Sequence, residues 1–223
     1  MTVLHLADEG EAADLAAFLS RLLHYDRGAA VRLQAAGTAL AVFGRPPSFE
    51  VLAIRAVRLA KPYENGLDVI LDVTVSAGEL LESVDESAAT AVVPDAVTGP
   101  PWAGVLPPRG GWRPEPGLPA PDSLRSMVSA AVAEFRSRTE ELATEQRTRA
   151  ELDRIGREIW SRTVGDTRLP VRAVHAAQSL GFLRAGGTEP ALFSSGAWLR
   201  LRTPYGSIAV RRAGLGALDV SVR

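Results

Sequence analysis

Apolar positions follow helical spacing in some parts of the chain and strand spacing in others. Between residues 12 and 23, alanine and leucine recur every three or four positions, which predicts an amphipathic helix ending near His24. Asp8 and Glu11 precede that run at the spacing of a capping box. Strands are predicted at residues 2–7, 31–42 with a turn at Ala36-Gly37, 49–59 and 67–75.

The C-terminal part repeats this order of helix and then strands. Residues 169–180 read as a helix with Pro170 in its first turn and Gly181 after its end. Alternating segments at 197–201, 208–210 and 218–222 then predict three strands. We therefore expect antiparallel sheet next to helix in both halves of the chain.

Two short stretches suggest an internal duplication. Gly28–Leu33 resembles Gly196–Leu201, and each is followed by a turn glycine and a return strand. Leu71–Val75 likewise resembles Leu218–Val222. Alternating strands look alike without common descent, so the duplication is a hypothesis. Whether the two sheets merge or stay separate is left open.

Residues 99–121 are rich in proline and hold 8 of the 15 prolines of the chain. Proline removes backbone donors and favours extended structure, so we expect a crossover rather than a sheet element. Trp102 and Trp112 lie within this segment. They either pin an ordered connection to the protein surface or serve as exposed anchors of a partner-binding loop.

Residues 122–163 predict one long helix or two nearly collinear ones. Asp122 is placed to cap the start, and apolar stripes near both ends flank a charged middle at 136–149. That middle is either a solvated spacer or an antiparallel dimer contact. The expected fold class is α+β, with two helix-plus-antiparallel-sheet units joined by a Pro-rich crossover and a long helix. The expected divisions are residues 1–97, 98–121, 122–163 and 164–223.

Composition limits the kinds of functional site that the chain can form. The chain has no cysteine, and its three histidines, His5, His24 and His175, lack the spacing of a metal site. No glycine-rich phosphate loop or nucleophile elbow is present, so we expect neither a cofactor nor a metal, and an enzyme is disfavoured. No secretory leader or membrane span is recognisable. We expect a cytoplasmic protein.

Charge is distributed unevenly behind a net charge of −1. Residues 147–223 carry 13 arginines against 6 acidic residues, a balance of +7, and residues 1–146 carry a balance of −8. This excess indicates either an anionic partner or internal compensation. The order of helix, turn, helix and hairpin after residue 150 is also that of a winged helix. The candidate nucleic-acid or anion-binding residues are Arg172, His175, Gln178, Trp198, Arg200, Arg202, Arg211 and Arg212.

Asp68 and Asp72 lie on the polar side of a predicted strand. They form either an acid pair or a solvated sheet face on which one of them pairs with Arg32; Asp219 and Arg200 permit the same pairing in the second unit. The leading functional hypothesis is a non-catalytic protein-interaction module that self-associates as a homodimer or binds another protein. The alternative is a nucleic-acid-binding protein that uses residues 147–223.

Overall fold

The computed structural model describes residues 2–36, 38–60, 71–184 and 189–212. Its α-helices are α1 (Glu9–Tyr25), α2 (Ala77–Glu82), α3 (Pro121–Glu140), α4 (Arg149–Trp160) and α5 (Val171–Ser179). Short 3-10 helices are η1 (Pro47–Phe49), η2 (Pro101–Gly104) and η3 (Thr144–Gln146). The strands are β1 (Val3–His5), β2 (Ala30–Ala36), β3 (Ala39–Gly44), β4 (Leu52–Arg58), β5 (Leu71–Ser76), β6 (Thr90–Val92), β7 (Arg113–Glu115), β8 (Ala191–Ser195), β9 (Trp198–Thr203) and β10 (Gly206–Arg211).

A single eight-stranded antiparallel sheet runs through both halves, in the order β5-β2-β3-β4-β10-β9-β8-β7. The halves meet where β4 pairs with β10, with Ile208 opposite Ala53. Strands β1 and β6 form a second, small sheet in the first half, which adjoins the end of β4 through a bridge between Leu6 and Leu59. The predicted α+β class with two helix-plus-antiparallel-sheet units is confirmed. The main sheets of the two units merge into one.

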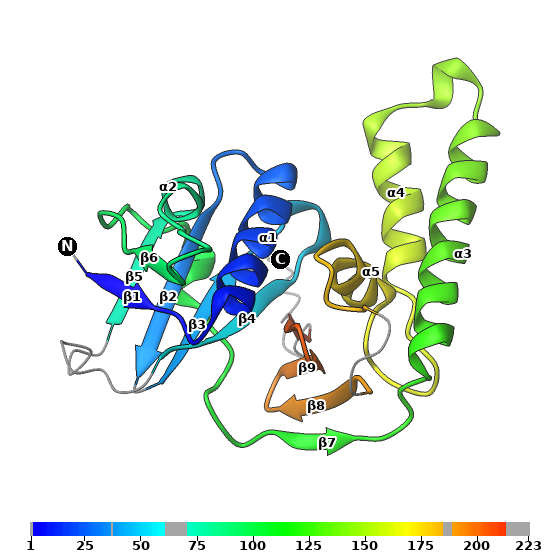
Figure 1. Ribbon diagram of the computed structural model, residues 1–223. Coiled ribbons are helices and arrows are strands. Elements are labelled where there is room, and N and C mark those ends of the chain that lie inside the picture. Colours follow the sequence, from blue (N-terminus) through cyan, green and yellow to red (C-terminus); the bar gives the residue numbers. More distant parts are fainter. Residues whose placement is uncertain (1, 37, 61–70, 185–188, 213–223) are drawn as a thin grey trace, which may run out of the picture.

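Helices α1 and α5 cover one face of the sheet, one over each half (Figure 1). Helix α1 forms where predicted because Asp8 accepts a hydrogen bond from the Glu11 amide at 2.8 Å, and its leucines face the sheet. Phe18 of α1 and Phe182, just after α5, stack with ring centroids 5.8 Å apart. The main core therefore continues from one unit into the other.

The sheet order matches the strands of the two units differently from the sequence similarity, with a shift of one strand. Helix α1 precedes β2, β3 and β4, and α5 precedes β8, β9 and β10. Counting outward from the β4–β10 junction, β2 corresponds to β8 and β3 to β9. The similarity of Gly28–Leu33 to Gly196–Leu201 instead matched β2 with β9. Alternation is common to all these strands and cannot fix which strand matches which.

The prediction of one long helix, or two collinear helices, is wrong. Helices α3 and α4 lie side by side as an antiparallel hairpin that extends beyond the sheet (Figure 1). Thr148 starts α4 anew by accepting a hydrogen bond from the Glu151 amide at 3.3 Å. At the other end Ala120, not Asp122, is the N-cap of α3.

Charged side chains of α3 pair with charged side chains of α4 and of the residues just after it. Arg138 on α3 donates to both carboxylate oxygens of Glu158 on α4 at 2.8 and 2.9 Å. Arg162, just after α4, reaches Glu134 on α3 at 2.5 and 2.8 Å. These ion pairs hold the hairpin together, so the charges are used within one chain. Residues 143–149 are exposed, as expected of the charged middle, but they lie in the connection between two helices rather than along one rod.

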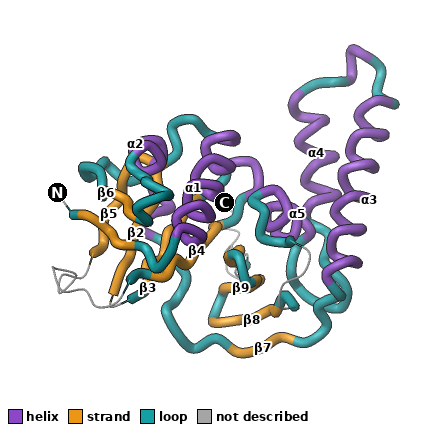
Figure 2. The backbone as a smooth tube through the Cα atoms, viewed as in Figure 1, coloured by secondary structure: helices purple, strands orange, loops and turns teal. Residues whose placement is uncertain are grey.

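Most of the Pro-rich crossover is irregular, apart from the short η2 and one strand (Figure 2). Contrary to expectation it contributes a strand, β7, which pairs with β8 and forms an edge of the sheet. Proline is tolerated on an edge strand because no neighbour requires its missing N–H. The predicted strand at 218–222, the start of 67–75 and the turn residue Gly37 lie outside the described residues.

Candidate partner-binding surface

The second face of the sheet is covered by the crossover rather than by helices. A small apolar cluster lies there, formed by Phe43, Leu52, Ile54 and Ala209, with Trp102, Leu106, Trp198 and Ala41 packed against it. This cluster spans the β4–β10 junction because β3, β4, β9 and β10 all contribute. The crossover is thus attached to both units.

Arg32 ties the start of the crossover to the sheet. Its guanidinium donates to Asp72 across β2 and β5 at 2.8 and 3.0 Å, and to the carbonyl oxygen of Ala103. The Arg32 hydrogen bond holds the pKa of the Asp72 carboxyl below its usual range. The predicted pairing of Arg32 with one of the two aspartates is confirmed, while Asp68 and Asp219 lie outside the described residues.

Trp102 is half-buried and leaves one side open. A pocket of about 400 Å³ lies beside it, lined also by Val97, Pro100 and Arg45. Val97 and Val105 flank the tryptophan in sequence and are 39% and 48% exposed. Exposed apolar side chains beside a pocket are typical of interaction sites. We call Val97, Trp102 and Val105 the crossover rim.

Trp112 is held in place by a hydrogen bond and by an arginine side chain. Its indole Nε1 donates to the carbonyl oxygen of Pro108 at 3.0 Å, and the Arg200 guanidinium lies 5.7 Å from its ring centroid. Ser195 also donates to the carbonyl oxygen of Gly110 at 3.3 Å. The Ser195 and Arg200 contacts thus attach the crossover around Trp112 to β8 and β9.

Five of the candidate nucleic-acid-binding residues lie on or beside this second face. Trp198, Arg200 and Arg202 alternate along β9 away from the main core, and Arg211 lies opposite Trp198 on β10. Arg202 covers the ring of Phe193 at 4.7 Å, and burial lowers the pKa of Arg200, with a smaller contribution from Arg202. Arg200 and Arg202 therefore already contact aromatic rings of the protein, those of Trp112 and Phe193. Arg212 donates to the carbonyl oxygen of Gly196.

The other three candidates lie on α5, in the helical layer. Helix α5 packs against β10 and α3, and burial lowers the pKa of its His175. The imidazole of His175 lies between the rings of Trp160 at 4.6 Å and Phe49 at 5.0 Å. Arg172 is half-buried and Gln178 is exposed. The winged-helix hypothesis does not match this arrangement, because β8, β9 and β10 belong to the large sheet and α5 covers that sheet.

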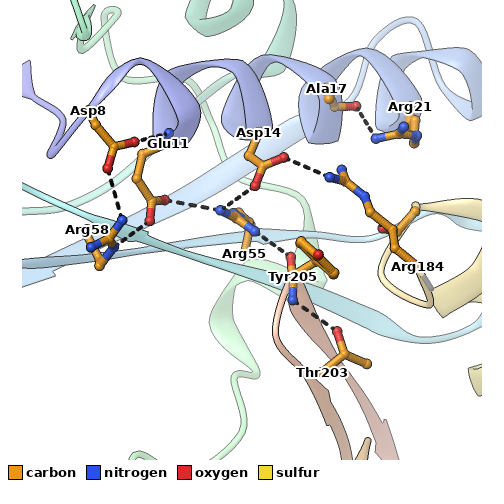
Figure 3. A network of polar contacts seen from close by, with 11 residues as sticks. Asp8, Glu11, Asp14, Ala17, Arg21, Arg55, Arg58, Arg184, Thr203 and Tyr205 are labelled. Carbon is orange, nitrogen blue, oxygen red and sulfur yellow. Dashed lines mark hydrogen bonds and ion pairs between the residues drawn. The ribbon is translucent and has the colours of Figure 1, made fainter. Parts of the chain in front are cut away.

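Sequence reasoning missed a polar network between the two units (Figure 3). Arg55 on β4 reaches Glu11 and Asp14 on α1 at 3.1 and 3.2 Å, and the carbonyl oxygen of Tyr205 at 2.8 Å. Arg58 extends the network by donating to Glu11 at 2.7 Å. The available signal was an arginine within the apolar run of β4.

The described part of the chain contains no group of three or more histidine, aspartate or glutamate side chains arranged to hold a metal ion. None of its helices combines the length and the apolar character that crossing a membrane requires.

Comparison with known proteins relates the chain to two domain families and to one fold. Residues 1–104 match a family described as a domain of unknown function (DUF8010), and residues 107–215 match a second one (DUF8185). No curated protein sequence matches the chain.

Solved structures give a whole-chain similarity. A DNA polymerase sliding clamp from Caulobacter crescentus superposes with a TM-score of 0.54 at 13% identity, covering 100% of this chain and 69% of the clamp. The clamp from Pseudomonas aeruginosa gives 0.50 at 12% identity, covering 98% of this chain and 66% of that clamp. The chain thus spans about two thirds of the length of these clamps and is similar to them in fold.

Proposed function

We propose that the protein is a non-catalytic interaction module that self-associates through its crossover rim. The observation that carries this proposal is the pocket beside Trp102, which the exposed side chain of Val97 also lines, together with the exposed Val105, whose amide donates to the Trp102 carbonyl oxygen. Trp102 of the rim packs on the second face of the sheet, and Val97 lies beside the edge strand β5. A second copy would shield apolar surface that water now contacts, which favours association.

The fold supports an interaction role. The chain is similar along its length to proteins described as DNA polymerase sliding clamps. By that analogy, the protein is a scaffold that acts beside DNA or beside proteins that act on DNA. A fold alone does not define a function, so the proposal rests on the rim and takes only its general setting from the analogy.

Sedimentation equilibrium from low to high micromolar concentration tests this proposal. We expect a monomer–dimer equilibrium that Val105→Asp weakens at least about tenfold, because a buried carboxylate loses hydration. Val3→Asp is the matched control, since Val3 is 41% exposed on β1, outside the rim. A protein that stays monomeric throughout, or a dimer equally sensitive to both variants, would refute self-association through the rim.

Nucleic-acid binding is the second candidate, favoured by the shared sheet face of Arg200, Arg202 and Arg211. Anisotropy of labelled duplex and single-stranded DNA, titrated with salt, measures it. Arg200→Ala and Arg202→Ala are each expected to weaken binding and to reduce the salt slope by about one. Absence of binding at low salt would eliminate this candidate.

A further inference from the structure

A cleft of about 780 Å³ opens between the α3–α4 hairpin, η1 and α5. This volume is within the range of pockets that hold small organic ligands, roughly 300–1,000 Å³. It is separate from the crossover rim, since the two sites share no lining residue. Its lining combines aromatic rings with arginines, which narrows the chemistry of a ligand.

The aromatic part of the cleft is Trp160 with Phe135. Trp160 is stacked on His175 with ring centroids 4.6 Å apart and an interplanar angle of 26°. Phe135 lies 6.2 Å from Trp160, between their ring centroids. Gly156 adjoins both rings, and a Cβ there would lie 3.5 Å from Trp160 and 3.6 Å from Phe135. The glycine therefore leaves the edges of both rings uncovered toward the cleft.

The cationic part consists of Arg149, Arg157 and Arg172. Within the described residues, Arg157 and Arg172 form no ion pair, and Arg149 approaches only Asp153, at 3.8 Å. The Nε of Arg172 is buried without a hydrogen-bond partner. By contrast, Arg138, Arg154 and Arg162 of the same hairpin all pair with carboxylates. In the part of the chain that the structure describes, Arg157 and Arg172 at the cleft are thus without carboxylate partners, as is Arg136 on α3, which lies outside the cleft.

Acidic groups balance this charge only in part. Glu50 and Asp153 also line the cleft, so its three arginines leave an excess of one positive charge. Glu50 has a left-handed backbone conformation with φ of 51°, which is uncommon for a residue with a side chain and often marks functional positions. The cleft suits a compact anion more than a highly charged polymer surface.

We propose that this cleft binds a nucleotide. The base lies against Trp160 and Phe135, as aromatic side chains commonly hold bases. The phosphate is bound by Arg157 and Arg172, whose planar guanidinium groups match phosphate oxygens in pairs. The same chemistry is present in a free mononucleotide and at the end of a single-stranded nucleic acid.

Calorimetric titration of the full chain with adenosine monophosphate, adenosine and inorganic phosphate tests the proposal. We expect the monophosphate to bind on the order of tenfold more tightly than either fragment, because only it uses both parts of the cleft. Arg157→Gln should weaken binding on the order of tenfold without changing thermal unfolding, since Arg157 is exposed and makes no ion pair in the described chain. Arg172→Gln tests whether the half-buried Arg172 also contributes to binding.

Arg113→Gln, an exposed arginine on β7 away from the cleft, is the matched control and should leave binding unchanged. A short single-stranded DNA, titrated in parallel, distinguishes the sources. Binding of either ligand that Arg157→Gln weakens supports the site, and the tighter ligand identifies the source. Absence of binding by both, or binding equally affected by Arg157→Gln and Arg113→Gln, would overturn the proposal.

Discussion

Arg55 Nη1 donates a hydrogen bond to the carbonyl oxygen of Tyr205 at 2.8 Å and so joins the two units through a side chain that is 6% exposed. Arg184 of the C-terminal unit provides a second link by donating to Asp14 of α1 at 3.1 Å. Its guanidinium also lies 4.6 Å from the ring centroid of Tyr205. Only three residue pairs connect β4 to β10. Side-chain contacts therefore supplement a short strand pairing at this junction.

Replacing Arg55 with methionine should destabilise the protein by about 3 kcal/mol, because the carboxylate of Glu11 and the Tyr205 carbonyl lose their buried partner. Arg58→Met is the matched control: it also removes an ion pair with Glu11, but its side chain is 70% exposed, so the loss should be much smaller. Urea unfolding of both variants measures the difference. Equal losses would show that Arg55 does not secure the junction.

Two glycines near the hairpin should respond oppositely to alanine. Gly156→Ala is expected to stabilise the protein by about 0.5–1 kcal/mol, since Gly156 lies inside α4 and the added Cβ makes only ordinary contacts. Gly165→Ala should destabilise by about 1 kcal/mol or more, because φ is +52° and the Cβ would lie 2.9 Å from Pro119. Thermal unfolding of both variants checks the signs. A destabilised Gly156→Ala protein would contradict the packing described for α4.

Local patterns predicted the individual elements well. The α1 helix, its cap at Asp8 and the β2–β3 hairpin follow from spacing and capping residues that act within a few positions. The Arg32–Asp72 pair was also predictable, because alternation placed both residues on one sheet face. These features depend on neighbours in the sequence or in an adjacent strand.

The remaining errors concern how elements meet. Propensity at residues 141–148 favoured helix, but ion pairs such as Arg138–Glu158 and Arg162–Glu134 form only when the chain folds back. The cleft likewise combines residues from distant segments, from Pro47 to Arg172. Strand β8 was missed, which shifted the proposed repeat by one strand. Tertiary contacts of this kind leave little local signal.

The hairpin should loosen in acid. Hydrogen bonds from Arg138 lower the pKa of Glu158 from 4.5 to about 2, and Arg162 lowers that of Glu134. Because the folded-state values are depressed, these pairs stabilise the hairpin above about pH 4.5, and this contribution is lost as the pH falls toward 2. Salt should reduce it, since both carboxylates contact solvent.

Carboxyl titration by NMR, with amide exchange across α3 and α4, follows this transition. Arg138→Gln is expected to move the Glu158 midpoint upward, toward its usual value, and to speed exchange at neutral pH. Arg113→Gln on β7 provides an arginine deletion outside the hairpin. A Glu158 midpoint near 4.5 in the unmodified protein would mean that the ion pair does not form in solution.

His175 should make stability fall between neutral and mildly acidic pH. Burial between Trp160 and Phe49 lowers the pKa of its imidazole from 6.5, so the unfolded chain takes up the proton more readily than the folded one. Stability is therefore complete above about pH 6.5 and declines as the pH falls toward the folded-state value. His175→Phe keeps an aromatic ring in the stack but cannot be protonated, so it should flatten the pH dependence in this range. Melting temperatures of both proteins from pH 5 to 8, roughly the window in which histidine titrates, provide the measurement. Unchanged curvature in the variant would assign the pH dependence to other groups.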